Sequence, residues 1–150
     1  MNIGILGAGN IAGSMARTIC GMAAQGRPVT LYAVASRSQE KADAFAKAYG
    51  IPRAYGSYAA MLNDPLVELV YIATPHSHHA EQIRQCVAAG KSVLCEKSFT
   101  ANAKQAEDVL REAETAGVYV AEAIWTRYMP ARGMIADIIA SGAIGVPRLL

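Results

Sequence analysis

A chain of 150 residues, 53% hydrophobic and 17% charged, is long enough for one globular domain with a real core. Its formal net charge of +2 is too small to indicate nucleic acid or an anionic membrane as a partner. No apolar run is long enough to span a membrane, and we expect no signal peptide because no charged and apolar leader precedes the first predicted strand. The three cysteines lack metal-ligand spacing and lie in apolar surroundings, which predicts buried, reduced thiols in a cytoplasmic protein.

Strand and helix patterns alternate through the first half of the chain. The predicted elements are a strand at 2–6, a helix from 10 to about 25, a strand at 30–35, a helix from 38 to 50, a strand at 53–55 and a short helix from 57 to 63. Ser57 is the expected N-cap of the short helix, and Ser38 is that of the helix from 38 to 50. Its expected apolar stripe consists of Ala42, Phe45, Ala46 and Tyr49.

The alternation continues through the second half. The predicted elements are a strand at 69–73, a helix that ends at 90, a strand at 92–95, a helix from 102 to 117, a strand at 118–121 and a last helix from about 130 to 140. Ser77 is expected to cap the first of these helices, and Asn102 the second, with Gln105 completing a capping box. The expected apolar stripe after Asn102 consists of Ala106, Val109, Leu110 and Ala113.

Six strands interleaved with helices predict a Rossmann-type, doubly wound parallel sheet in a three-layer α/β/α arrangement, because parallel neighbours need long, right-handed crossovers. The expected strand order is 3-2-1-4-5-6. Ligands of such a sheet bind outside the carboxyl ends of the strands, where the order reverses. Candidate site residues are therefore those that directly follow each strand.

A Gly-x-Gly-x-x-Ala motif at residues 7–12 closes the first strand and opens the first helix. This is the dinucleotide fingerprint in its expected place. Gly7 permits a tight turn, Gly9 allows close approach of a pyrophosphate, and Ala12 keeps the helix near the sheet. Asn10 and Ile11 begin the helix whose free N–H groups hold the phosphates. A P-loop is excluded because no Gly-Lys-Ser/Thr follows the glycines.

Ser36 and Arg37 follow the second strand, where a carboxylate would normally bind the adenosine ribose of NAD. A guanidinium beside hydroxyl groups suits a 2′-phosphate instead, which predicts NADP as the cofactor, with NAD as the alternative. The simpler interpretation of Arg37 is a solvated residue at a helix start. An S-adenosylmethionine methyltransferase is disfavoured, since it would need an acid at this position.

The loop after the fourth strand contains three histidines in four residues, at 76, 78 and 79. A zinc site is disfavoured because the run lies on one short loop without Cys or carboxylate partners at ligand spacing. We expect Thr74 and Pro75 to shape a loop beneath the nicotinamide ribose, with His76 beside it. His79 is either a further cofactor-side residue or a packed, hydrogen-bonded structural one.

Glu96 and Lys97 follow the fifth strand, and Trp125 and Arg127 come shortly after the sixth. A lysine beside the nicotinamide could hydrogen-bond the hydroxyl or carbonyl being converted. The alternative for Lys97 is a surface residue that opens a loop. Trp125 either anchors the core at the sheet edge or forms a wall of the cleft on its nicotinamide side.

Together these segments resemble the Gfo/Idh/MocA oxidoreductase family. The resemblance rests on the turn at 7–12, the loop at 73–76 with His79, the pair Glu96–Lys97 and the Glu-Ala-Ile-Trp-Thr-Arg stretch at 122–127. The Ser-Arg and Trp-Thr-Arg segments are most similar to the branch that includes dimeric dihydrodiol dehydrogenase, xylose dehydrogenase and glucose–fructose oxidoreductase. The chain departs from the family at Ser98, where the family's Glu-Lys-Pro has proline, and loss of that fixed φ is expected to loosen the turn without abolishing activity.

The resemblance implies that Lys97 is the catalytic lysine, which positions the substrate oxygen and joins a proton relay. It implies no metal ligand. The expected cofactor-binding set is Gly7, Gly9, Asn10, Ile11, Ala12, Ser36, Arg37, Thr74, Pro75, His76, His79, Glu96, Trp125 and Arg127.

The resemblance also implies a division of the chain into a cofactor domain at 1–123 and, at 124–150, a connecting helix with the start of a second domain. That second domain would complete the substrate pocket and a homo-oligomer interface, and a stop in an expected strand at 145–150 favours a fragment over a naturally short protein. The predicted function is the cofactor-binding part of an NADP-dependent oxidoreductase acting on a sugar, polyol or related hydroxyl or carbonyl compound. The alternative is a non-catalytic nucleotide-binding or redox-sensing module.

Overall fold

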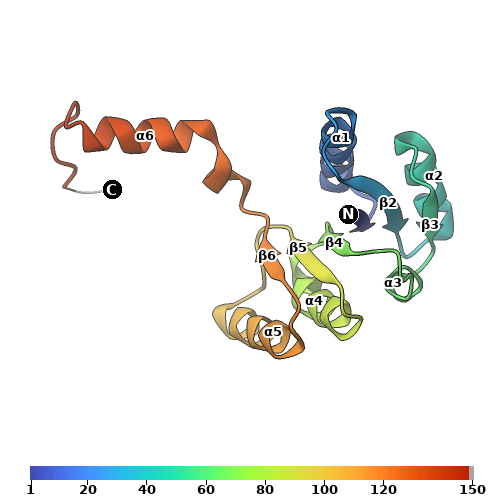
Figure 1. The fold of residues 1–150 in the computed structure, drawn as a ribbon. Coiled ribbons are helices and arrows are strands. Elements are labelled where there is room, and N and C mark those ends of the chain that lie inside the picture. The colour runs from blue at the N-terminus through green and yellow to red at the C-terminus, as the bar shows by residue number, and fades with distance from the viewer. Residues whose placement is uncertain (149–150) are drawn as a thin grey trace.

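The computed structural model describes residues 1–148, and its centre is one parallel sheet of six strands in the order β3-β2-β1-β4-β5-β6 (Figure 1). The strands are β1 (Asn2–Leu6), β2 (Thr30–Ala35), β3 (Arg53–Tyr55), β4 (Leu69–Ile72), β5 (Ser92–Cys95) and β6 (Val120–Glu122). The α-helices are α1 (Asn10–Ala24), α2 (Gln39–Tyr49), α3 (Tyr58–Leu62), α4 (His79–Ala88), α5 (Ala103–Ala116) and α6 (Pro130–Ala140), and two 3-10 helices are η1 (His76–His78) and η2 (Trp125–Tyr128). The predicted doubly wound sheet and its order are confirmed.

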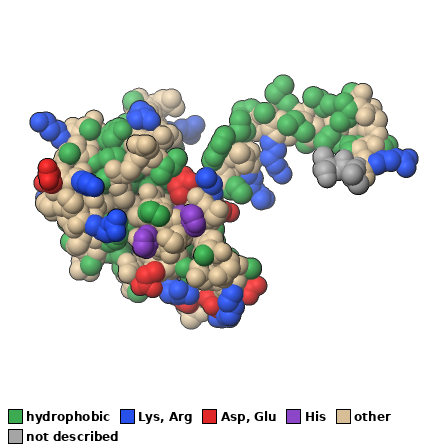
Figure 2. All heavy atoms as spheres, turned by 180° about the vertical axis from the view of Figure 1, so that it is seen from behind, with side chains coloured by type: hydrophobic (Ala, Val, Ile, Leu, Met, Phe, Trp, Pro, Cys, Tyr) green, Lys and Arg blue, Asp and Glu red, His purple; other side chains and the backbone are tan. Residues whose placement is uncertain are grey.

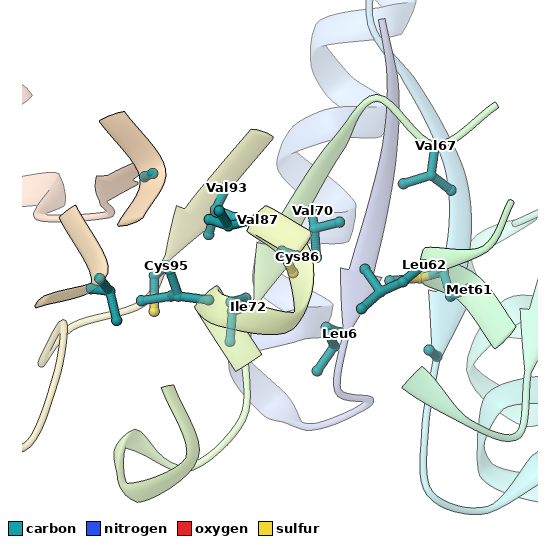
Figure 3. Close-up of a cluster of buried hydrophobic side chains, with 14 of the residues drawn as sticks. Leu6, Met61, Leu62, Val67, Val70, Ile72, Cys86, Val87, Val93 and Cys95 are labelled. Atoms are coloured by element: carbon teal, nitrogen blue, oxygen red, sulfur yellow. The ribbon is translucent and has the colours of Figure 1, made fainter. Parts of the chain in front are cut away.

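Helices cover both faces of the sheet, because each crossover between parallel strands passes over one face. On one face, α1 and α2 enclose a cluster that includes Ile5 of β1 and Ala16 of α1. On the opposite face, α3, α4 and α5 pack around a second cluster (Figure 3). Ile72 of β4, Cys86 of α4 and Val93 of β5 lie together in this second cluster, and each is fully buried. These two clusters form the core of a three-layer domain.

Three predicted helix caps are confirmed. The side chains of Ser38, Ser57 and Asn102 each accept a hydrogen bond from a first-turn backbone N–H, in α2, α3 and α5. The predicted capping box is shifted by one residue, since Gln105 accepts from the N–H of Ala101 rather than from that of Asn102. The prediction for Ser77 is wrong, because Ser77 lies inside η1 and the chain continues from η1 directly into α4.

Two further predictions from the pattern are wrong. Leu110 is 47% exposed, because α5 turns only a narrow stripe that includes Val109 and Ala113 toward the sheet. The sixth strand starts at Val120 rather than at residue 118, since its ladder with β5 begins where Val120 pairs with Val93.

The cysteines do not share one environment. Cys86 and Cys95 are buried free thiols, and burial raises the pKa of Cys86 to about 12. Cys20 lies exposed on α1, so the prediction that all three are buried is wrong; the apolar residues near it in sequence lie partly on the outer side of the helix. Within residues 1–148, no helix is long and apolar enough to cross a membrane.

Helix α6 extends away from the sheet (Figure 1), and none of its residues is buried. Figure 2 shows hydrophobic side chains along this projecting segment. They include Met134, Ile135, Ile138 and Ile139. Residues 145–148 form no strand, because a strand needs a paired neighbour and no described segment runs beside them; Leu149 and Leu150, the end of the expected strand, lie outside the described residues.

Replacing Asn102 with Ala should lower the free energy of unfolding by about 1 kcal/mol, because the N–H of Gln105 loses its capping oxygen. Urea denaturation of wild type and variant measures the difference. Asn63→Ala is the matched control, since Asn63 is exposed and its side chain forms none of the described hydrogen bonds. We expect the control to change stability by less than about 0.5 kcal/mol. Equal losses in both variants would contradict the capping role.

Candidate functional site

The carboxyl ends of all six strands lie level at one edge of the sheet, since Ala35 at the end of β2 also pairs with Tyr55 at the end of β3. Leu6 of β1 pairs with Ala35 of β2 on one side and with Ile72 of β4 on the other. Ile72 in turn pairs with Cys95 of β5, and Cys95 with Glu122 of β6. The residues that directly follow these paired positions therefore lie in one row along the carboxyl ends of the strands. The row crosses the point where the strand order reverses, which is where doubly wound sheets bind ligands.

The turn after β1 approaches the neighbouring loop without a side chain between them. Gly7 has a φ of +109°, and a Cβ on this residue would lie 2.9 Å from the carbonyl oxygen of Ala73. The N–H of Gly7 donates to the carbonyl oxygen of Ala35 at 2.8 Å, which joins the ends of β1 and β2. Only glycine fits this position without displacing the loop after β4.

Open space follows this turn. A Cβ on Gly9 would have no atom within 4 Å, and Gly9 is the N-cap of α1 without a side-chain cap. The first N–H groups of a helix carry partial positive charge and bind anions. Ala12 is fully buried against the sheet, while Asn10 and Ile11 are exposed at the helix start. The backbone and the space at Gly9 therefore fit the pyrophosphate of a dinucleotide.

Arg37 lies close to the loop that follows β4. Its side chain lines a cavity of about 70 Å³ together with Thr74 and Pro75. The preceding residue, Ser36, is buried, and its Oγ accepts the N–H of Ser38 at 3.4 Å. The structure thus brings residues of two predicted cofactor segments, after β2 and after β4, to the wall of one cavity.

His79 connects the loops after β4 and β5. It is 1% exposed, and its two ring nitrogens each lie 2.9 Å from a backbone carbonyl oxygen, that of Thr74 at Nε2 and that of Ser98 at Nδ1. Both nitrogens therefore face backbone acceptors, and a neutral imidazole donates its one N–H to one of them. His76 and His78 are exposed on η1. Among residues 1–148, no group of three His, Cys, Asp or Glu is placed to hold a metal ion.

Glu96 is a buried carboxylate directly beside Lys97. Its Oε1 accepts the hydroxyl hydrogen of Tyr71, and its Oε2 accepts the backbone N–H of Lys97 at 3.0 Å. Burial, followed by the hydrogen bond to Glu96, raises the pKa of Tyr71 well above its ordinary value, so the phenol is a hydrogen-bond donor at neutral pH. The side chain of Lys97 is exposed, and its peptide bond to Ser98 is cis.

Trp125 and Arg127 lie farther along the sheet face. Trp125 is 61% exposed and lines an apolar hollow of about 420 Å³ with Leu94, and the hollow reaches Glu96 at the site edge. It also borders a second apolar hollow of about 650 Å³ along α1. Arg127 is exposed in η2, and its side chain forms none of the described hydrogen bonds or ion pairs. The structure does not bring Arg127 into contact with the residues after β1, β4 and β5.

Three residues at the site were not predicted from the sequence. They are Tyr71, which bonds Glu96; Gln82, whose Oε1 accepts the hydroxyl of Thr74; and Glu122, whose Oε1 accepts the N–H of Phe99 at 3.0 Å. A signal existed only for Tyr71, because a phenol within an aliphatic strand needs a polar partner when it is buried.

An open parallel sheet with a glycine turn after β1 and polar side chains after β2, β4 and β5 defines a dinucleotide-binding α/β domain. The model of an oxidoreductase family with an NAD-binding Rossmann fold, GFO_IDH_MocA, matches residues 1–124. The chain belongs to this family, as its motifs predict.

Curated relatives are longer than this chain. A trans-1,2-dihydrobenzene-1,2-diol dehydrogenase from Mus musculus is 39% identical over 146 residues, which cover 97% of this chain and 43% of the relative. A D-xylose 1-dehydrogenase (NADP(+)) from Hypocrea jecorina is 37% identical over 150 aligned positions, which cover 95% of this chain and 38% of the relative. The chain therefore spans less than half the length of the curated relatives it matches. Both relatives fall in the predicted branch of the family.

Solved structures share the fold. A 3-ketoreductase from Actinomadura kijaniata, in complex with TDP-benzene and NADP, is 29% identical with a TM-score of 0.88, over 97% of this chain and 45% of that one. An NAD binding oxidoreductase from Klebsiella pneumoniae is 33% identical with a TM-score of 0.82, over 95% of this chain and 39% of that one.

The two glycines of the turn should respond differently to alanine. Gly7→Ala should lower the free energy of unfolding by about 2 kcal/mol, because of its positive φ and the contact with Ala73. Gly9→Ala should cost less than about 1 kcal/mol but weaken NADPH binding about 10-fold, because the new methyl group occupies the open space at the start of α1. Urea unfolding and NADPH fluorescence titration measure the two effects. Unchanged NADPH binding by Gly9→Ala would show that the phosphates lie elsewhere.

Proposed function

We propose that residues 1–123 form the cofactor-binding domain of an NADP(H)-dependent oxidoreductase. The observation that carries the proposal is the position of Arg37, which shares a cavity with Thr74 and Pro75 at the edge where the strand order reverses. No carboxylate follows β2 before Glu40 to repel a 2′-phosphate. The NADP in the name of the xylose dehydrogenase and in the complex of the 3-ketoreductase supports the same cofactor.

The residues that would hold NADP(H) fall into three groups along the site edge. The backbone at Gly7 and Gly9 and the start of α1 fit the pyrophosphate. Ser36 and Arg37 fit the adenosine end. At the nicotinamide end, the predicted residues are Thr74, Pro75, His76, Glu96 and Trp125, with His79 holding the loops from behind and Arg127 as an outlying member. When bound, NADP(H) supplies or accepts a hydride at the substrate carbon.

Lys97 is the proposed catalytic residue. Its exposed side chain lies just after the carboxyl end of the interior strand β5, while its backbone N–H donates to Glu96. The ammonium group of Lys97 is suited to donate a hydrogen bond to the substrate oxygen and to hold the proton that leaves or joins it.

The proposed substrate is a sugar, polyol or related hydroxyl or carbonyl compound, in line with the names of the two dehydrogenases. Residues 124–150 would connect the cofactor domain to a further region, because the family model ends at residue 124 and α6 has no buried residue. The whole protein is proposed to form a homo-oligomer. Its proposed location is the cytoplasm, since the free thiols of Cys86 and Cys95 fit a reducing compartment.

A non-catalytic NAD(P)-binding module is the alternative function. A binding module needs the turn at Gly7 and Gly9 but gives no reason for a lysine at the end of β5. Assays of the whole protein with NADP and a panel of sugars and polyols separate the two functions. Turnover supports the enzyme, and cofactor binding without turnover of any compound supports the module.

Replacing Arg37 with Ser should weaken NADPH binding about 10- to 100-fold and leave NADH binding almost unchanged, because only NADPH carries the 2′-phosphate. Fluorescence titration of both cofactors against wild type and variant measures the change. Arg27→Ser is a matched control, since Arg27 is an exposed arginine in the turn between α1 and β2. Equal affinity of the wild type for NADH and NADPH would contradict the proposed selection.

Replacing Lys97 with Met should lower kcat of the whole protein about 10²- to 10⁴-fold while NADPH still binds, because Met keeps an unbranched side chain of similar size but removes the charge and the proton. Steady-state kinetics and NADPH titration measure the two effects separately. The exposed Lys47 on α2 provides the control variant Lys47→Met. Unchanged turnover in Lys97→Met would remove this residue from the mechanism.

A further inference from the structure

Tyr71 is a buried phenol within an otherwise aliphatic stretch of β4. It is 1% exposed and belongs to the apolar cluster on the α1 side of the sheet, with Ile5 and Ala73 as fellow members. A phenylalanine would fill this volume equally well, so packing alone gives no reason for the hydroxyl group. The hydroxyl donates to Oε1 of Glu96, which follows the adjacent strand β5.

The carboxylate of Glu96 has one oxygen for each of two partners. Oε1 accepts from Tyr71, and Oε2 accepts from the backbone N–H of Lys97 at 3.0 Å. Since Glu96 is only 8% exposed, each oxygen depends on these protein donors in place of water. The side-chain conformation of Glu96 is therefore tied at both oxygens, and with it the backbone of Lys97.

Lys97 is also held on its other side. The carbonyl oxygen of Ser98 lies 2.9 Å from Nδ1 of His79, so the segment from Glu96 to Ser98 is anchored before and after the lysine. The His79 anchor comes from the first residue of α4, and the Tyr71 anchor from β4. Removing the contact of Tyr71 or that of His79 would leave Lys97 at the end of β5 but with a less well-defined orientation.

We infer that Tyr71 is a positioning residue for Lys97, acting through the carboxylate of Glu96, an inference that rests on the proposed role of Lys97 as the catalytic residue. Without the hydroxyl of Tyr71, Oε1 of Glu96 loses its donor in a buried site, and the carboxylate turns toward solvent to regain one. Oε2 then moves away from the N–H of Lys97. Small displacements of a reacting group reduce rates strongly, because catalysis depends on alignment.

The variant Tyr71→Phe in the whole protein tests this inference. We expect kcat to fall about 10-fold or more, the dissociation constant of NADPH to change less than about 2-fold, and KM for the substrate to change little. Hydrogen exchange at the backbone amide of Lys97 should become faster, because its acceptor is lost, while amides in the middle of β1 and β4 keep their protection.

A half-buried phenol provides the control. Tyr55 at the end of β3 donates its hydroxyl to Oδ2 of Asp64 at 2.6 Å, so Tyr55→Phe removes the same kind of hydrogen bond at another place. This variant should lower stability without changing kcat or the exchange of the Lys97 amide. A general loss of stability would affect both variants alike, so a fall in kcat in Tyr71→Phe alone separates positioning from folding.

A double-mutant cycle tests the route through Glu96. If Tyr71 acts only through this carboxylate, Tyr71→Phe combined with Glu96→Ala should lower kcat no further than Glu96→Ala alone. Additive losses would overturn the route. Glu96→Ala also serves if Tyr71→Phe fails to fold, since it removes the acceptor of both donors and should also accelerate exchange at Lys97.

The outcomes are distinct. In an active enzyme, a wild-type kcat for Tyr71→Phe would overturn the inference, whatever the hydrogen exchange at the Lys97 amide shows. Absence of NADP-dependent turnover in the wild-type whole protein would instead contradict the proposed function. In that case hydrogen exchange at Lys97 still decides whether Tyr71 holds this segment.

Discussion

The candidate site depends on one close approach of backbone to backbone at Gly7. The N–H of Gly7 reaches the end of β2 at Ala35, and the absence of a Cβ lets the turn lie against the carbonyl of Ala73 after β4. Because three strands meet at this residue, their following loops share one reference point. From Ala73 the linkage continues through Thr74 and His79 to Ser98, next to the proposed catalytic lysine. The conformation at Gly7 is therefore connected, through these contacts, to the segment that carries Lys97.

Much of the fold could be predicted from the sequence, because it depends on local signals. Periods of apolar residues, glycines after helices and capping side chains such as Ser38 and Asn102 act within a few residues of one another. The wrong predictions concern features that depend on contact with a neighbouring helix or strand. The start of β6 depends on its pairing with β5, and the exposure of Leu110 depends on how α5 lies against the sheet. A single helix or strand pattern does not contain this information.

The site was predictable in outline and not in its contacts. Parallel strands bring their carboxyl ends to one edge, so Ser36, Thr74 and Lys97 could be grouped from chain order alone. The bond between Tyr71 and Glu96 joins two strands diagonally, and it depends on register and on the face to which each side chain points. His79 illustrates the same limit, because its burial between two carbonyl groups follows from the positions of two separate loops.

The uncovered apolar surface beside Trp125 has a thermodynamic consequence. Leu69 and Leu94 line the hollows on this face, and Ile135 on α6 is 58% exposed. Contact through such surfaces is entropy-driven near room temperature and weakens on cooling, whereas high salt leaves it intact or strengthens it. Ionic contacts of Arg37 respond differently, because added salt screens and weakens them. Temperature and ionic strength thus act separately on the two sides of this small domain.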